Sequence, residues 1–271
     1  MAGRRLFRPR FRVIIREMWP TLVKIGPLEL GTFGLMAALG FLAAYLVFRA
    51  EVRRRGLPVP LASDALVAAI VGGLIGARLN FIIEYWEAFV VNPWSFIWSR
   101  YGFTWYGGVL GGALGVIIIL KIRRQALGRY ADAVAPALAL GYVFGRAGCQ
   151  LSGDGDYGVP SDLPWAMAYP RGLVPTTERV HPTPIYEMII FLAIFFVLWR
   201  LRKLDKPPWW LFALYLVLAG VERFGIEYIR TNEPLAAGLT EAQLVSVALV
   251  VGGGLWLAFL EARRRRAESA R

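Results

Sequence analysis

The sequence predicts an all-α polytopic membrane protein of about seven transmembrane helices, with a small extracytoplasmic head. Of its 271 residues, 57% are hydrophobic and only 18% are charged, whereas a soluble domain carries about 25% charged residues. The apolar residues are grouped in blocks long enough to cross a bilayer. The segments between the blocks are all much shorter than the roughly 100 residues of an independent soluble domain. A single membrane domain is therefore expected.

The apolar blocks set the expected spans. We place them at 31–48, 61–85, 103–120, 131–151, 185–198, 209–224 and 244–260. The fourth block is more polar than the others and the fifth is short, so their ends are expected to move by several residues. The predicted organisation is a basic N-terminal interfacial segment at 1–30, the transmembrane domain at 31–260 with an extracytoplasmic loop at 152–184, and a basic cytoplasmic tail at 261–271.

Basic residues alternate between the connecting segments and so predict the orientation. They are concentrated in the first, third and fifth connections and in the tail, for example at 53–55 and 263–266. Because basic loops stay on the cytoplasmic side, the C-terminus is expected inside and the N-terminus outside. Residues 1–24 oppose this assignment, since they hold seven basic residues. They fit an interfacial amphipathic helix on anionic lipid; an eighth element or an inverted topology is the alternative.

The composition also limits the chemistry. The chain has one cysteine, Cys149, and one histidine, His181, which excludes an intrachain disulfide, a cysteine cluster and a polyhistidine metal site. No metal and no cofactor are expected. The net charge of +12 favours anionic membrane lipid over nucleic acid as the partner, because the basic residues flank the predicted spans.

Three arginines, Arg78, Arg146 and Arg223, lie inside apolar blocks. A charge at membrane depth is costly and usually faces a cavity or a partner. The predicted topology puts all three in the outer half of the bilayer, where they would repel one another unless an anion lay between them. A guanidinium matches phosphate bidentately, so a lipid headgroup phosphate is the expected ligand. The alternative is snorkelling, or pairing with Glu84, Glu222 or Glu227.

Other polar residues lie near the same end of the spans. The glycine-rich run 145–158 follows Arg146 and contains Cys149, Asp154, Asp156 and Gly158; its glycines permit unwound backbone beside a ligand. Asp154 and Asp156 are a weak metal signal, and a solvated turn is the simpler interpretation. Cys149 fits a small packed residue better than a site of covalent attachment.

The entrances to two predicted spans supply candidate proton acceptors. Glu187 is expected inside the apolar region and needs a partner, for which one of the arginines is the natural candidate. Tyr106 is either an interfacial aromatic residue or a proton acceptor beside arginines. His181 is either a general base or polar surface.

At these positions the chain resembles the prolipoprotein diacylglyceryl transferase family. The matching motifs run in order along most of the chain: Gly76–Leu79, Tyr106–Gly108, Gly145–Gly158, His181–Glu187 and Arg223–Arg230. The resemblance implies a seven-span bundle in the bacterial cytoplasmic (inner) membrane, N-out and C-in, with its active site toward the extracytoplasmic face. It implies transfer of a diacylglyceryl group from phosphatidylglycerol to the lipobox cysteine thiol of a preprolipoprotein signal peptide, with release of glycerol phosphate.

The resemblance also implies roles for the candidate residues. Arg146, Arg223 and Tyr106 would be catalytic, with Tyr106 as the preferred base and His181 as the reserve. The expected substrate-binding residues are Arg78, Glu187, Glu227, His181, Asp154, Gly158 and Cys149. Several family positions differ here, because Tyr106, Cys149, Ser152, Phe33 and Ala219 replace the family's histidine, asparagines and tyrosines. These changes affect proton transfer and positioning more than anion binding.

Two other functions remain open at this point. One is a relative that kept the headgroup pocket as a phospholipid-binding protein but lost the chemistry. The other is a lipid or anion transporter that uses the same arginines. A transporter is expected to have paired broken helices in related halves, and the sequence offers one candidate break, at 145–158.

Overall fold

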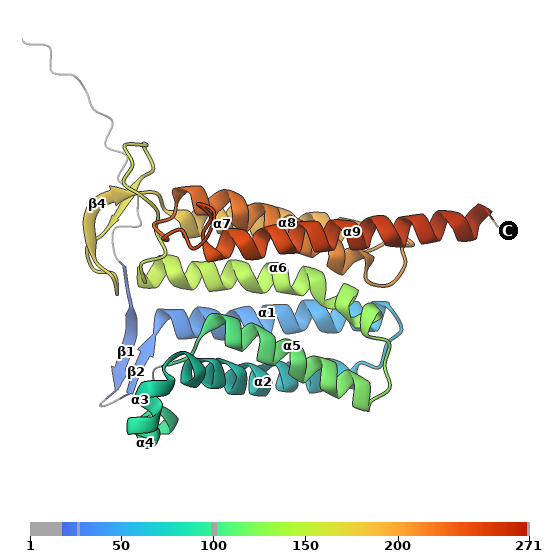
Figure 1. Ribbon diagram of the computed structural model, residues 1–271, viewed down its shortest axis with the longest axis horizontal. Helices are drawn as coiled ribbons and strands as arrows, with labels where there is room; N and C mark the ends of the chain where they lie inside the picture. The colour runs from blue at the N-terminus through green and yellow to red at the C-terminus, as the bar shows by residue number, and fades with distance from the viewer. Residues whose placement is uncertain (1–17, 26–27, 99–101, 270–271) are drawn as a thin grey trace, which may run out of the picture.

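The computed structural model describes residues 18–25, 28–98 and 102–269. It is a bundle of long, nearly parallel or antiparallel helices with two small two-stranded sheets at one end (Figure 1). The long helices are α1 (Thr32–Arg54), α2 (Pro60–Glu84), α5 (Trp105–Ile122), α6 (Leu127–Ser152), α7 (Thr183–Leu201), α8 (Trp210–Ile226) and α9 (Glu241–Ser269). The short ones are α3 (Trp86–Val91), α4 (Pro93–Trp98) and the 3₁₀ helix η1 (Glu227–Ile229).

Five of the long helices, α1, α2, α5, α7 and α9, are long and apolar enough to cross a membrane. Most of their apolar surface is not covered by the rest of the described chain: in the most apolar stretch of α2, only 6% of the residues are buried. A helix satisfies its own backbone hydrogen bonds, so such a surface is stable against lipid. The structure therefore supports a multi-pass membrane protein, with α6 and α8 outside this set of five.

Helix α6 lies in the middle of the bundle, with α1 on one side and α7 and α8 on the other (Figure 1). It is rich in small residues, and Ala133, Ala135, Ala137 and Ala139 are buried. Its surroundings are largely other helices rather than lipid. This explains the weak apolar signal of the fourth predicted span, because a helix surrounded by protein does not need a lipid-compatible surface.

Glycines join α2 to α5. A Cβ atom added to Gly76 would lie 2.3 Å from the carbonyl oxygen of Gly107, and one added to Gly111 would lie 2.3 Å from that of Gly72. Only glycine allows the two backbones to approach this closely. The pair is otherwise attached to the rest of the bundle mainly through α1.

Gly111→Ala is expected to separate these helices. The new methyl group would also lie 2.8 Å from the Cα atom of Gly76, and backbone atoms on both sides leave it no room. Overpacking of this kind costs about 1–3 kcal/mol or more. Thermal unfolding of the purified protein in detergent measures the loss.

Gly254→Ala in α9 is the matched control, because its added Cβ would meet nothing within 4 Å. Alanine is the better helix former by up to about 1 kcal/mol, so this variant should unfold at the same temperature as the parent or slightly above it. Equal unfolding temperatures for the two variants would contradict the close packing of α2 on α5.

A buried ion cluster fixes the end of the bundle opposite the sheets. Glu51 on α1 is fully buried and pairs with Arg54, with Arg55 and with Arg202 beyond α7. Asp132 on α6 accepts hydrogen bonds from the backbone N–H groups of Trp209 and Phe212, both at 3.0 Å. This carboxylate satisfies free N–H groups in the first turn of α8, and so fixes the start of that helix.

The two sheets lie at the other end. Strand β1 (Thr21–Ile25) pairs antiparallel with β2 (Leu28–Gly31), and β3 (Met167–Tyr169) with β4 (Thr176–Val180). The segment Thr21–Ile25 is thus extended rather than part of the helix considered for 1–24, consistent with the strand preference of its β-branched residues. The other residues of that segment up to 17 lie outside the described part of the chain. Strands β3 and β4 occupy the predicted extracytoplasmic loop, between α6 and α7.

Candidate functional site

Three arginines meet at the sheet end of the bundle. Arg146 comes from the last two turns of α6, Arg223 from the last turn of α8, and Arg230 from the residue after η1. The exposed fraction of the side chain is 15% for Arg146, 24% for Arg223 and 10% for Arg230. Three segments far apart in the sequence therefore place guanidinium groups in one cluster. The last turns of α6 and α8 and the first turns of α7 and α9 lie at this end of the bundle (Figure 1).

Glu187 is the central carboxylate of this cluster. Its side chain is fully buried in the first turns of α7. It lies 3.2 Å from Arg146 Nε and 3.6 Å from Arg223 Nη1. The Tyr142 hydroxyl donates a 2.8 Å hydrogen bond to Glu187 and accepts one of 2.7 Å from Arg146 Nη2. The sequence predicted that Glu187 is buried and needs an arginine as partner, and Arg146 and Arg223 are those partners.

Asp156 links the other side of Arg146 to Arg230. It forms an ion pair with Arg146 and lies 2.5 Å from Arg230 Nη2. Helix α6 ends at Gly153 in the left-handed conformation (φ 59°), and Gly155 is also left-handed (φ 95°). These two turns bring the chain back over Arg146, because glycine adopts positive φ without a steric cost.

Asp154, the acidic residue that we expected in the site, has a different contact. Its carboxylate accepts the backbone N–H of Asp156 at 3.3 Å, so it stabilises the turn. Asp156, which the sequence suggested to be part of a solvated turn, is the carboxylate held by the arginines. The two-residue offset from Asp154 to Asp156 follows from the left-handed glycines, which turn the two side chains in different directions.

The electrostatic balance at Asp156 has a consequence for stability. Burial alone would raise the pKa of Asp156, but the charges of Arg146 and Arg230 outweigh burial and lower the pKa to about 2. The unfolded value is about 3.9. The ion pairs therefore stabilise the folded state above about pH 4, and this contribution is lost as the pH falls from about 4 toward 2.

Asp156→Asn is expected to melt below the parent protein in detergent at pH 6, with a smaller difference at pH 3. The substitution removes the charge that acid removes from the parent, so the two proteins become more alike at low pH. Asp162→Asn, at an exposed position, is the control and should melt like the parent at both pH values. A difference of the same size at pH 6 and pH 3 would contradict the assignment.

Glu227 is the third carboxylate. It lies 2.9 Å from Arg223 Nη2 and accepts hydrogen bonds from Asn232 at 2.6 Å and from the Thr240 hydroxyl at 2.8 Å. Thr240 also caps α9: its hydroxyl accepts the N–H of Gln243, whose side chain accepts the N–H of Thr240. This reciprocal capping box fixes the start of α9 beside the cluster.

Gly158 holds the returning loop against α7 and η1. Its N–H donates to the carbonyl of His181 at 2.8 Å, and a Cβ at this position would lie 2.2 Å from the carbonyl oxygen of Ile229. Any larger residue would push the loop away from η1. Gly158 therefore acts on the site through the backbone, by allowing the loop that carries Asp156 to lie close to Arg230.

The two candidate bases have different surroundings. His181 Nδ1 lies 3.3 Å from the Tyr186 hydroxyl, which accepts a 2.7 Å hydrogen bond from the indole of Trp165. Tyr106 is half-buried in the first turn of α5. It is close enough to Arg223 and Glu227 for electrostatic interaction. Tyr106 is thus within electrostatic reach of the arginine cluster, and His181 lies in a separate aromatic group at the entrance of α7.

Arg78 is not brought into the cluster. It lies on α2, where it donates a 2.9 Å hydrogen bond to the carbonyl of Phe96 and stacks 4.2 Å from the ring centre of Phe103. Arg146 and Arg223 meet Arg230 instead. The sequence placed Arg230 beyond the end of a span and gave it no role; its position three residues after Glu227 was the available signal.

The cluster contains its own anions: the sequence predicted an arginine partner for Glu187 and offered Glu227 as an alternative partner, but it gave Asp156 no such role. Among the described residues, the ion pairs of the three arginines with Asp156, Glu187 and Glu227 balance three charges against three. The buried Glu222 on α8 forms none of these pairs but interacts electrostatically with all three arginines. Several buried polar atoms there still have no hydrogen-bond partner in the described chain, including Arg223 Nη1 and Arg230 Nε. The guanidiniums are thus held in place by carboxylates, and these two atoms contact Glu187 and Glu227 at ion-pair rather than hydrogen-bond distance.

Cys149 is buried in the last turns of α6. Its Sγ atom, with Asp154 and Asp156, belongs to a set of ligand atoms within 4.8 Å of one another. The same sulfur lies 3.7 Å from Arg146 Nη1, and Asp156 is already paired with two arginines. A cation at this point would face two guanidinium charges, so the donor set suits an arginine better than a metal ion.

Comparison with known proteins agrees with this geometry. The family model for prolipoprotein diacylglyceryl transferase matches residues 20–259. The chain is 32% identical over 240 residues to a protein of Clostridium tetani, covering 87% of this chain and 95% of the relative. It is 33% identical over 255 residues to a protein of Marinomonas sp., covering 89% and 93%. For a protein of Trichormus variabilis the identity is 32% over 258 residues, covering 91% of each.

All three relatives bear the name phosphatidylglycerol–prolipoprotein diacylglyceryl transferase. The matched region begins before β1 and ends in α9, so it includes every element that contributes to the arginine–carboxylate cluster. The chain belongs to the prolipoprotein diacylglyceryl transferase family.

Proposed function

We propose that this protein transfers the diacylglyceryl group of phosphatidylglycerol to the thiol of the lipobox cysteine of a preprolipoprotein. The observation that carries the proposal is the cluster of Arg146, Arg223 and Arg230, each oriented by a carboxylate. Fixed guanidiniums suit a reaction that creates negative charge on a phosphate group. The family membership and the names of the relatives support the same reaction.

The transfer balances without a metal or a redox partner. The cysteine thiol gives up its proton, and its sulfur forms a bond to the terminal glycerol carbon of the diacylglyceryl group. The bond from that carbon to the phosphate oxygen breaks, and its electron pair stays on the oxygen. Glycerol phosphate leaves with one more negative charge than the diester carried. Arginine side chains lower the energy of this charge as it develops.

Arg223 has the strongest case for direct contact with the phosphate. It keeps the largest exposed fraction of the three arginine side chains, 24%. Arg146 is more enclosed and connects Asp156 to Glu187. We assign Arg223 to the phosphate and Arg146 to both phosphate binding and the integrity of the site.

For membrane placement, we propose seven spans in the bacterial cytoplasmic membrane, with α6 and α8 added to the five most apolar helices. The basic connections and tail support a cytoplasmic C-terminus, which puts the arginine cluster and the β3–β4 head on the extracytoplasmic side. Labelling of intact cells with a membrane-impermeant maleimide tests this. A cysteine at Ser161 should react, and one at Ala267 should not; the reverse result would invert the topology.

The direct test of function combines purified protein, phosphatidylglycerol and a lipobox peptide in detergent. A thioether-linked diacylglyceryl peptide and free glycerol phosphate are expected in equal amounts. Bound lipid without product would contradict the transferase and indicate a phospholipid-binding relative.

Tyr106→Phe tests the proton acceptor. The hydroxyl interacts electrostatically with Arg223 and Glu227, and loss of a general base lowers turnover by about 10²-fold or more. The rate of thioether formation measures the effect, and Tyr186→Phe beside His181 is the control for loss of a hydroxyl in the second candidate group. If Tyr186→Phe lowers the rate and Tyr106→Phe does not, His181 is the base.

A further inference from the structure

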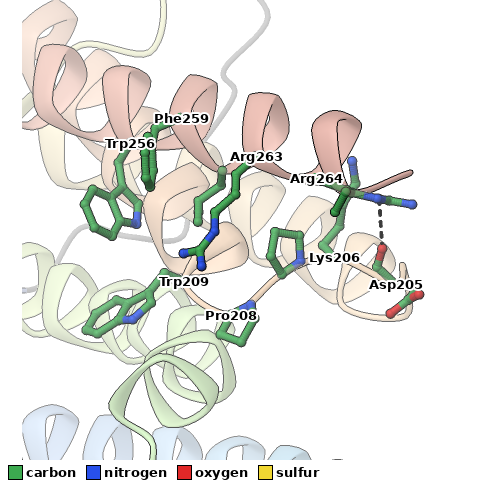
Figure 2. A pocket seen from close by; sticks show the side chains of 11 residues that line it. Asp205, Lys206, Pro208, Trp209, Trp256, Phe259, Arg263 and Arg264 are labelled. Carbon is green, nitrogen blue, oxygen red and sulfur yellow. Dashed lines mark hydrogen bonds between the residues drawn. The ribbon is translucent and has the colours of Figure 1, made fainter. Parts of the chain in front are cut away.

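A cavity lies at the end of the bundle opposite the arginine–carboxylate cluster. It has a volume of about 730 Å³ and lies between the α7–α8 connection and the C-terminal half of α9. Its wall is mainly aromatic and apolar, with basic residues at the edge (Figure 2). None of the residues assigned to the transferase site lines it.

Arg263 supplies the positive charge that this cavity offers to a ligand. Figure 2 shows its side chain reaching from α9 across the cavity toward Trp209 and Pro208. The neighbouring cations are already engaged: Lys206 pairs with Glu261, and Arg264 pairs with Glu268 at 2.8 Å. Arg263 has no ion pair or hydrogen bond among the described residues of the chain. Its charge is therefore available to a ligand.

The walls show what kind of ligand fits. Trp256 and Phe259 line the cavity and keep 46% and 53% of their exposure. They adjoin Leu255, which is 68% exposed on the apolar length of α9. The cavity is thus continuous with a surface suited to acyl chains, and a ligand must be both anionic and apolar. Exposed indoles beside arginine are typical of the depth at which lipid headgroups lie.

The surrounding charge favours the same ligand. The segments 200–206 and 261–268 hold eight Lys or Arg residues and three Asp or Glu residues. Basic pockets between transmembrane helices bind anionic headgroups, and a guanidinium matches a phosphate in a bidentate manner.

We propose that this cavity binds one anionic phospholipid, with its headgroup phosphate on Arg263 and its acyl chains along Trp256 and Phe259. This site would hold a structural or regulatory lipid. It differs from the site of transfer, since it lies at the other end of the bundle and needs no peptide substrate. Phosphatidylserine is a suitable probe because it is anionic and lacks the glycerol headgroup of the proposed substrate.

The test is fluorescence quenching by lipids with brominated acyl chains in detergent micelles. The signal of Trp256 is the difference between the full chain and its Trp256→Phe variant. Brominated phosphatidylserine should quench this signal at a lower concentration than brominated phosphatidylcholine. Arg263→Gln should raise the apparent Kd for phosphatidylserine by about tenfold, the scale of one charge-assisted hydrogen bond.

Arg266→Gln is the matched control, since it removes the same charge from the same helix outside the cavity. It should leave the apparent Kd unchanged. Equal quenching by both lipids, or equal effects of the two variants, would overturn the proposal. Displacement of the lipid by millimolar inorganic phosphate would also overturn it, because a free anion would then suffice. The readout needs neither peptide nor turnover, so it does not depend on the outcome of the transferase test.

Discussion

Arg223→Ala is expected to lower the rate of thioether formation by about 10²- to 10³-fold, the usual effect of removing one group that stabilises charge in a transition state. The fold should survive this change. Glu227 keeps Asn232 and Thr240 as hydrogen-bond donors, and Glu187 keeps Arg146 and Tyr142. No carboxylate of the cluster is left alone. The loss should therefore appear in turnover and not in the unfolding temperature.

Two variants sharpen this prediction. Arg223→Lys keeps the charge but loses the planar, bidentate geometry, so it should recover only part of the activity. Arg123→Ala is the control, because it removes an arginine from an exposed ion pair with Asp64, outside the cluster; it should retain full activity. Near-normal turnover in Arg223→Ala would remove this arginine from the mechanism.

Arg146→Ala is a less informative variant. Arg146 contacts both Asp156 and Glu187, and its removal leaves the buried Glu187 with the Tyr142 hydroxyl and a 3.6 Å ion pair to Arg223. Loss of activity in that variant would combine a catalytic and a folding defect. The structure therefore makes Arg223 the better test of phosphate stabilisation, although the sequence suggested equal value for both.

Glu187→Ala is expected to destabilise the protein by roughly 3–5 kcal/mol, the cost of removing one partner of a buried ion pair. The side chain is fully buried and lies between Arg146 and Arg223. Without it, the two guanidiniums face each other with no carboxylate between them, and the Tyr142 hydroxyl loses its acceptor. Chemical or thermal unfolding in detergent measures the loss.

Glu187→Gln separates the contribution of the carboxylate charge from that of side-chain shape and hydrogen bonding. The amide keeps the shape and an acceptor for Tyr142 but carries no charge, so its unfolding temperature should lie between those of Glu187→Ala and the parent. Glu178→Ala, at an exposed position in β4, is the control and should stay within about 0.5 kcal/mol of the parent. Parent-like stability in Glu187→Ala would mean that Glu187 does not hold the arginines together.

Much of the fold could be predicted from the sequence because it depends on local properties. The long apolar blocks predicted the long helices, although α1 and α9 extend beyond the expected ends. The close contact of α2 with α5 is also written in the sequence, because glycines stand at 72, 76, 107 and 111, where the two backbones meet. The weak apolar signal of the fourth block reflects the central, protein-covered position of α6.

The contacts within the site were less predictable. Asp154 and Asp156 are two residues apart, and no property of composition or spacing decides between them. The choice depends on the left-handed turns at Gly153 and Gly155, which direct Asp156 toward Arg146 and Arg230. Arg78 was expected in the cluster and lies outside it, whereas Arg230 was given no role and belongs to it. The depth of a residue in the membrane does not determine which side of the bundle it faces.

By itself, the sequence determined that this is a helical membrane protein of the prolipoprotein diacylglyceryl transferase type with arginines at one end of its helices. A transmembrane span is recognised from a run of consecutive apolar residues, so no knowledge of the helices packed against it is needed. Only the tertiary structure decided which carboxylate orients which arginine, and that the cluster is balanced rather than purely positive. Ion pairs depend on the relative positions of helix ends and on the turns between them, and these are set by packing of the whole bundle.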